Sequence, residues 1–156
     1  MPLTRNTLIL LAVGGSAALL AGAFAFQHLG GLAPCVLCLW QRWPHAAAVL
    51  LGALALALPG RALPVLGALA ALTTAGIGGF HAGVELGWWP GLASCSGGAG
   101  LTGLTASQLL DPTLDVAAPV PCDAVAWSLA GLSMAAWNAV LSTALAGLWL
   151  LAARRA

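Results

Sequence analysis

The sequence has no lysine, no tyrosine and very little charge. Five arginines and four acidic residues make up only 6% of its 156 residues, whereas a soluble domain carries about 25% charged residues. This composition excludes an ordinary soluble fold. The formal net charge of +1 also excludes a nucleic-acid partner, because neutralising several phosphates requires a basic patch that is absent here.

Several cofactor signatures are missing as well. The chain has no haem-attachment CxxCH, no flavin motif and no nucleotide-binding loop. Its single CxxC motif is accompanied neither by a second CxxC nor by paired histidines, so a structural zinc site is not expected. We predict no metal site.

What is present is a series of long apolar segments, in a chain that is 61% apolar. Crossing a bilayer as a helix takes about 20 residues, and no period-two alternation indicates strands. The first segment exceeds the 7–15-residue core of a signal peptide, so we expect it to be retained. The sequence predicts an all-α membrane protein of one domain, residues 1–156, built as a four-transmembrane-helix bundle. The predicted spans are residues 7–26, 39–58, 63–84 and 127–152, and the predicted outer loops are 27–38 and a long one, 85–126.

Charge placement predicts the orientation. If four helices alternate, Arg5, Arg61, Arg154 and Arg155 fall on one side, which the positive-inside rule makes cytoplasmic. The acidic residues and all four cysteines then face the opposite side. We therefore expect cytoplasmic termini and periplasmic cysteines.

Tryptophans and small residues favour structural roles. Most tryptophans lie near predicted membrane boundaries, as in an interfacial aromatic belt, and Trp149 is expected at the inner one. Residues Gly67, Ala71, Ala75, Gly79 and Gly83 recur every four positions, a spacing that lets helices approach closely in lipid. We interpret this stripe as packing.

The CxxC motif, Cys35-Val-Leu-Cys38, precedes the second span. A disulfide closing so small a ring contributes only about 2 kcal/mol of stability, whereas the closeness of the two thiols favours exchange. Cys38 is expected at a helix N-terminus, where the dipole favours a thiolate. Arg42, one turn later, can stabilise an anion there; the alternative is a side chain that snorkels to lipid phosphate.

Cys95 and Cys122 lie at the two ends of a glycine- and proline-rich loop. A bond between them would contribute roughly 3.5 kcal/mol if it were merely structural. Beside a reactive pair on the same membrane face, disulfide exchange is the better hypothesis. Four cysteines allow three pairings, and the sequence does not choose among them.

Three segments carry a recognisable pattern: residues 34–42 (PCVLCLWQR), residues 81–95 with HAGVE, two tryptophans and a cysteine, and residues 122–137 (CDAVAWSLAGLSMAAW). In this order and topology they resemble the disulfide bond formation protein B (DsbB) family over essentially the whole chain. One departure is Gln41, which stands where an acidic residue often precedes the arginine.

The resemblance implies a dithiol oxidase of the bacterial inner (cytoplasmic) membrane and a role for each cysteine. Cys95 would form a mixed disulfide with a periplasmic, DsbA-like thioredoxin-fold oxidase. Cys122 would then engage Cys35. Cys38 would pass the electrons to a membrane quinone through a thiolate–quinone adduct that Arg42 stabilises.

The same resemblance implies a quinone site that includes His81 and Met134. Trp137 lies deep enough to stack on a quinone ring. Each residue has a structural alternative: a hydrogen-bonded packing histidine, a core methionine, an interfacial tryptophan. His28 and His45 are expected at the interface, and Glu85 either pairs with His81 or ends the helix.

The acceptor follows from redox potential. The family's soluble partner is strongly oxidising, at about −120 mV, so its reoxidation requires an acceptor of higher potential; we expect ubiquinone rather than menaquinone. Three alternatives stay open: a paralogue dedicated to one client, a vitamin K epoxide reductase-like enzyme, and a membrane scaffold whose disulfides only brace the outer loops.

Overall fold

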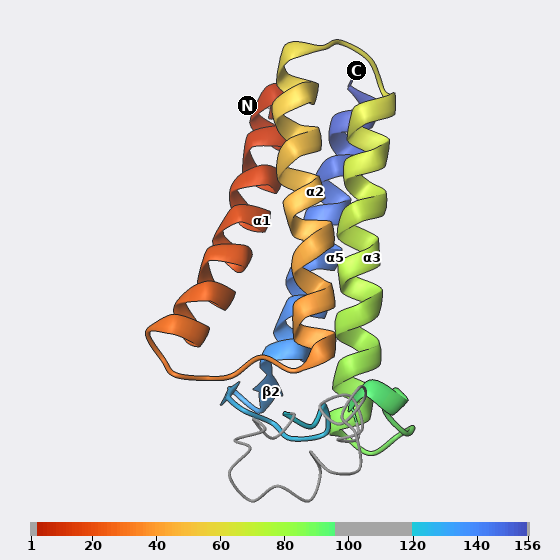
Figure 1. Cartoon of the computed structure of the whole chain (residues 1–156). Helices are drawn as coiled ribbons and strands as arrows, with labels where there is room; N and C mark the ends of the chain where they lie inside the picture. Colours follow the sequence, from red (N-terminus) through yellow and green to blue (C-terminus); the bar gives the residue numbers. More distant parts are fainter. Residues whose placement is uncertain (1–2, 96–119, 156) are drawn as a thin grey trace, which may run out of the picture.

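The computed structural model describes residues 3–95 and 120–155. These residues form four long helices, one short 3-10 helix and a two-stranded hairpin. The long helices pack as a bundle with both chain termini at the same end (Figure 1). The elements are α1 Arg5–His28, α2 Val36–Ala57, α3 Ala62–Glu85, η1 Ala93–Cys95, β1 Ser128–Leu129, β2 Leu132–Ser133 and α5 Met134–Arg154.

The predicted limits of the first three helices agree with the structure within three residues. The predicted start of the last helix, residue 127, is wrong, because a β-hairpin precedes α5. Ala130 and Gly131 have positive φ angles of 51° and 79°, which matches the left-handed turn of a tight hairpin. Ser133 then caps α5 by accepting the backbone N–H of Ala136 at 3.2 Å.

A large tryptophan fills the core near the end that carries the termini. Trp149 is fully buried, so it packs inside the bundle and does not face lipid as a residue of an interfacial belt would. A Cβ atom built on Gly67 would lie 2.6 Å from the Trp149 ring, which shows that only glycine permits this packing of α3 on α5. The predicted stripe of small residues is thus a packing surface at Gly67 and Ala71, whereas a Cβ atom built on Gly79 would meet nothing within 4 Å.

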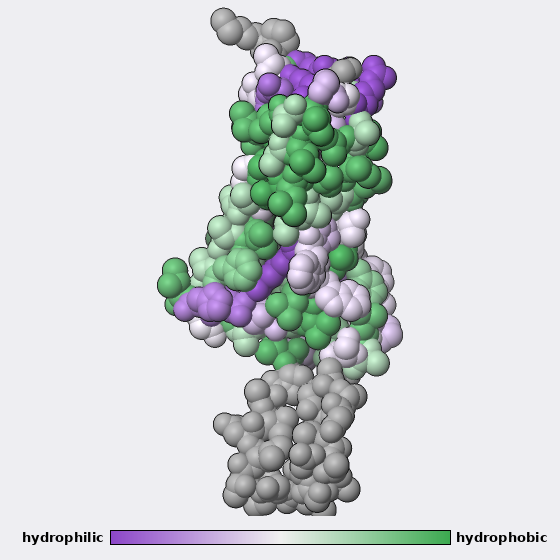
Figure 2. Space-filling view, turned by 45° about the horizontal axis from the view of Figure 1, so that its top comes forward, coloured by the Kyte–Doolittle hydropathy of each residue, from purple (hydrophilic) through white to green (hydrophobic). Residues whose placement is uncertain are grey.

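Much of the helix surface is apolar. Leu10, Leu50, Leu69 and Val140, one from each long helix, are exposed. Figure 2 shows hydrophilic residues gathered at the end with the termini and a broad apolar band beside it. Among the described residues, three helices are long and apolar enough to cross a membrane: α1, α3 and α5, with mean hydropathies of 2.2, 1.6 and 1.5.

Helix α2 differs from the other three. It is 22 residues long, but its mean hydropathy is too low for it to count among these three helices, because several of its side chains are polar. Two of these, Gln41 and His45, are buried, so the polar face of α2 points into the bundle. Most of the predicted outer loop, residues 96–119, lies outside the described residues.

Candidate functional site

Two cysteine pairs meet at the end of the bundle opposite the termini. Cys95 and Cys122 form a disulfide. Cys35 and Cys38 are free thiols whose Sγ atoms lie 3.0 Å apart. Cys35, Cys95 and Cys122 share one buried cluster, and Cys38 packs against it. The structure therefore holds one oxidised pair next to one reduced pair.

Cys35 is the N-cap residue of α2. Its Sγ atom accepts the backbone N–H of Cys38 at 3.3 Å and lies 3.0 Å from the Cys38 thiol sulfur. The Cys38 thiol hydrogen bond, against the opposing effect of burial and with help from His81, lowers the pKa of the Cys35 thiol to about 4. We expected the thiolate on Cys38; the cap geometry places it on Cys35 while both are reduced.

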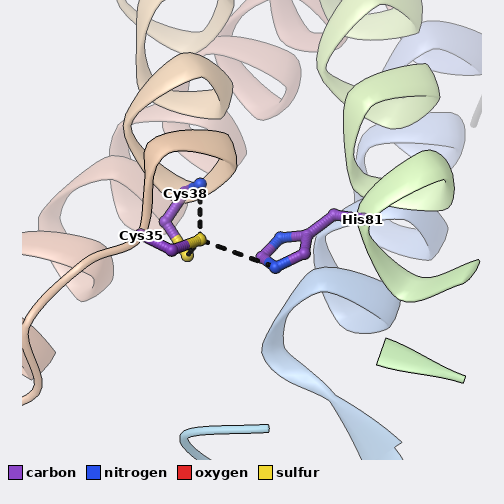
Figure 3. A group of neighbouring side chains, drawn as sticks. All are labelled: Cys35, Cys38 and His81. Atoms are coloured by element: carbon purple, nitrogen blue, oxygen red, sulfur yellow. Dashed lines mark hydrogen bonds between the residues drawn. The ribbon is translucent and has the colours of Figure 1, made fainter. Parts of the chain in front are cut away.

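His81 of α3 faces this pair (Figure 3). Its Nε2 atom lies 3.6 Å from Cys35 Sγ and 3.2 Å from the backbone oxygen of Cys122. Glu85, one turn further along α3, places Oε1 3.8 Å from the same nitrogen and also accepts a hydrogen bond from Ser133. His81 thus contacts a residue of each cysteine pair.

The two free thiols and His81 also have the spacing of a partial metal site. Their three potential ligand atoms lie within 4.8 Å of one another. A structural zinc site needs a fourth ligand and a free lone pair on the histidine nitrogen. Here His81 Nε2 points at the Cys122 backbone oxygen, which can only accept a hydrogen bond, so the nitrogen carries a proton.

Behind His81 lies Gln41, buried in the bundle. Its Nε2 atom donates to the backbone oxygen of Leu37 at 3.1 Å and lies 3.1 Å from His81 Nδ1. Its Oε1 atom accepts a hydrogen bond from Asn138 Nδ2 at 2.7 Å. Gln41 therefore connects the histidine of α3 to the asparagine of α5.

Asn138 continues these contacts. Its Nδ2 atom also donates to Thr74 of α3, at 3.0 Å to Oγ1 and 3.3 Å to the backbone oxygen. Its Oδ1 atom accepts from Ser142 at 3.3 Å and lies 2.8 Å from His45 Nε2. His45 is buried in these contacts, so its expected interfacial position is wrong.

An apolar cavity of about 380 Å³ opens beside the thiols, between α1, α2, α5 and the hairpin. Figure 1 shows α1 diverging from α2 toward this end. The volume lies within the range of about 300–1,000 Å³ that is typical of small-molecule pockets. The cavity lining includes all five residues predicted for the quinone: Cys38, Arg42, His81, Met134 and Trp137.

Arg42 lies across the cavity against α1. Its Nη1 atom donates to Gln27 Oε1 at 2.6 Å, its Nη2 atom lies 3.4 Å from the oxygen of Ala23, and its Cζ atom lies 4.7 Å from the Phe24 ring centre. Within the described residues, its buried Nε has no partner, and neither does His45 Nδ1. An apolar cavity lined by an arginine suits a ligand whose oxygen accepts hydrogen bonds.

The comparisons with known proteins agree with this arrangement. The model of the family described as "Disulfide bond formation protein DsbB" matches residues 5–152. The chain belongs to the DsbB family. It is therefore a membrane oxidoreductase of disulfide bond formation, and dependence on a quinone follows from the family. This membership favours the DsbB-type enzyme over the vitamin K epoxide reductase-like alternative.

Three curated relatives named "Disulfide bond formation protein B" match most of the chain. The protein of Azoarcus sp. (strain BH72) is 32% identical, covering 99% of this chain and 97% of the relative. The protein of Verminephrobacter eiseniae is 39% identical (95% and 84%), and that of Methylococcus capsulatus is 38% identical (86% and 85%). No solved structure matches the chain significantly.

Sequence reasoning missed Asn138 and noticed Gln41 only as a departure from the DsbB pattern. A signal for Asn138 was available, because a polar residue inside an apolar span is costly and usually functional. The contacts of Gln41 with His81 and Asn138 had no such signal, because they depend on the register between α2, α3 and α5.

Proposed function

We propose that this DsbB-family protein reoxidises a periplasmic, DsbA-like thioredoxin-fold dithiol and passes the electron pair to ubiquinone. One observation carries the proposal: His81 contacts both cysteine pairs, and Cys38 of the second pair lines an apolar cavity. Cys95 and Cys122 accept electrons, Cys35 and Cys38 relay them, and Arg42, Met134 and Trp137 hold the quinone.

The proposed orientation puts the cysteines in the periplasm and both termini in the cytoplasm. Arg5 donates to the backbone oxygens of Leu58 and Gly60 in the α2–α3 turn, so the basic residues gather at the end with the termini, as the positive-inside rule requires. We propose that α2 also spans the membrane, since its polar side chains are covered by the other helices.

The first exchange takes place at the disulfide. A thiolate of the soluble partner attacks the sulfur of Cys95 and releases Cys122 as a thiolate. Both cysteines are buried, so partner docking must expose Cys95.

The second exchange moves the electron pair inward. The Cys122 thiolate attacks Cys35 of an oxidised Cys35–Cys38 bond and releases Cys38. The partner's second thiol then resolves the mixed disulfide at Cys95, and the Cys95–Cys122 bond re-forms as Cys122 leaves Cys35. The structure corresponds to the resulting state, with that disulfide closed and both CxxC thiols reduced.

The last step starts from these thiols. The Cys35 thiolate accepts the proton of Cys38 along their 3.0 Å contact, which makes Cys38 the anion beside the cavity. The pair then closes to a disulfide as two electrons and the proton now on Cys35 leave. A quinone held in the cavity would accept the two electrons and this proton, together with a second proton from solvent. Arg42 lines the cavity and its Nε has no protein partner, so in this proposal the guanidinium turns to donate to a quinone oxygen, and ubiquinone suits the high potential that a strongly oxidising partner demands.

The test is oxidation of a reduced periplasmic dithiol protein by the full chain in ubiquinone-containing membranes. Cys38→Ser should abolish quinone reduction, and Cys122→Ser should trap the partner on Cys95. A Cys38→Ser protein with unchanged activity would show that the chain is a scaffold with structural disulfides. Attachment of the partner through another cysteine would overturn the order of the relay.

A further inference from the structure

The hydrogen bonds around His81 fix which of its ring nitrogens carries the proton. Gln41 Nε2 contacts the backbone oxygen of Leu37, and a carbonyl oxygen only accepts hydrogen bonds, so this atom is the NH₂ group of the amide. His81 Nδ1, 3.1 Å from the same NH₂, must then be an acceptor without a proton. The ring proton therefore sits on Nε2.

A second line of contacts fixes Gln41 itself. Thr74 Oγ1 gives its only proton to the backbone oxygen of Gln41 at 3.1 Å, so it can only accept from Asn138. Asn138 Nδ2 is thereby the NH₂ group, which agrees with its contact to the Thr74 backbone oxygen. This group also donates a hydrogen bond to Gln41 Oε1. Turning the Gln41 amide over would set two NH₂ groups against each other.

The other ring nitrogen agrees with this assignment. His81 Nε2 faces the backbone oxygen of Cys122 at 3.2 Å and the Cys35 sulfur at 3.6 Å, as Figure 3 shows for the sulfur. Glu85 Oε1, at 3.8 Å, is beyond hydrogen-bond distance, but its charge favours a proton on the same nitrogen. The Cys122 oxygen can only accept a hydrogen bond, so the proton lies on Nε2.

We infer that Gln41 and Asn138 are positioning residues: they hold His81 as the Nε2–H tautomer, so that it donates a hydrogen bond to Cys35 and cannot ligate a metal ion through Nε2. Two thiols and a histidine form a set of soft ligands that favours zinc or copper(I). A metal-binding histidine normally donates its second ring N–H to an acceptor; here that nitrogen meets an NH₂ group. The hydrogen bond favours Cys35 as the thiolate, and the reduced pair stays free for electron transfer.

The contribution to the relay rests on the proposed function, whereas the tautomer and the metal discrimination do not. They can be measured on the full chain with the Cys95–Cys122 bond intact and the CxxC pair reduced. The chain has only three histidines, so ¹⁵N-histidine NMR resolves each ring.

Two variants should reverse the tautomer. Gln41→Glu offers only acceptor oxygens to His81 Nδ1, which then takes the proton. Asn138→Asp does the same without touching His81, because Gln41 must turn its NH₂ toward the new carboxylate. The matched control is Ser142→Ala, which removes another hydrogen bond to Asn138 and should leave His81 unchanged.

The expected results are an Nε2–H His81 in the unmodified chain and in Ser142→Ala, and a proton on Nδ1 in the other two variants. Zinc affinity of the reduced pair should rise roughly 10–100-fold in those two, the usual effect of a second-sphere hydrogen bond. An unmodified chain with His81 protonated on Nδ1 overturns the inference outright, without reference to any variant. A changed tautomer with unchanged zinc affinity refutes the metal discrimination. If Gln41→Glu or Asn138→Asp loses oxidase activity while His81 keeps its proton on Nε2, the residue acts on the relay and not on the tautomer, which refutes the positioning role.

Discussion

The ionisation of Cys35 gives the sharpest prediction. Its pKa is lowered to about 4, first of all by the Cys38 thiol hydrogen bond. Hydrogen bonds to charged groups are worth about 1.5–3 kcal/mol, and one pKa unit corresponds to about 1.36 kcal/mol. Cys38→Ala should therefore raise the pKa of Cys35 by roughly 1–2 units. Cys38→Ser keeps a donor and should raise it less.

The assay is thiolate ultraviolet absorbance against pH, on protein whose Cys95–Cys122 bond is closed. Because the pKa is lowered in the folded protein, the thiolate signal should persist from neutral pH down to about pH 4 and disappear below it. The associated stability is present above the unfolded pKa and is lost as the pH falls through the folded value. A signal that appears only above pH 8, or a Cys38→Ala profile identical to that of the unmodified chain, would refute the reasoning.

Three further predictions concern packing, the cavity and the redox pair. Gly67→Ala should lower the free energy of unfolding by about 1–3 kcal/mol, because its Cβ would meet Trp149 at 2.6 Å. Thermal unfolding in detergent measures this. The control is Gly76→Ala, whose Cβ would meet nothing within 4 Å. Arg42→Lys keeps the charge but removes Nε, so ubiquinone binding should weaken about tenfold in a direct titration; unchanged binding would exclude that donor. His81→Leu removes the hydrogen bond to the Cys35 thiolate, so it should lower the reduction potential of the free cysteine pair. The expected change is about 30 mV for each unit by which the pKa of Cys35 rises. His81→Gln keeps a donor and should lower the potential less; equilibration with glutathione measures both variants.

The sequence predicted the helices and the sulfur chemistry because both leave local signals. Three spans follow from apolar length, and Arg42 lies one turn from Cys38, so both line one cavity. Burial was harder to predict. In a chain this apolar, hydrophobicity does not distinguish a core position from a lipid-facing one, so Trp149 and His45 were both placed at the interface although both are buried.

The register between the helices could not be predicted from the sequence either. That Gln41 contacts His81 and Asn138 depends on how three helices align, which no motif encodes. The hairpin before α5 depends on two positive φ angles, of which only the one at glycine has a sequence signal.

The central claim is that electrons which enter at the Cys95–Cys122 pair are transferred to the Cys35–Cys38 pair. It can be tested with fully oxidised, quinone-depleted protein, one equivalent of a reduced DsbA-like dithiol, rapid acid quenching and mass tagging of free thiols. The account predicts tags on Cys35 and Cys38, with Cys95 and Cys122 still bonded. Tags that remain on Cys95 and Cys122 while the CxxC pair stays oxidised would contradict it.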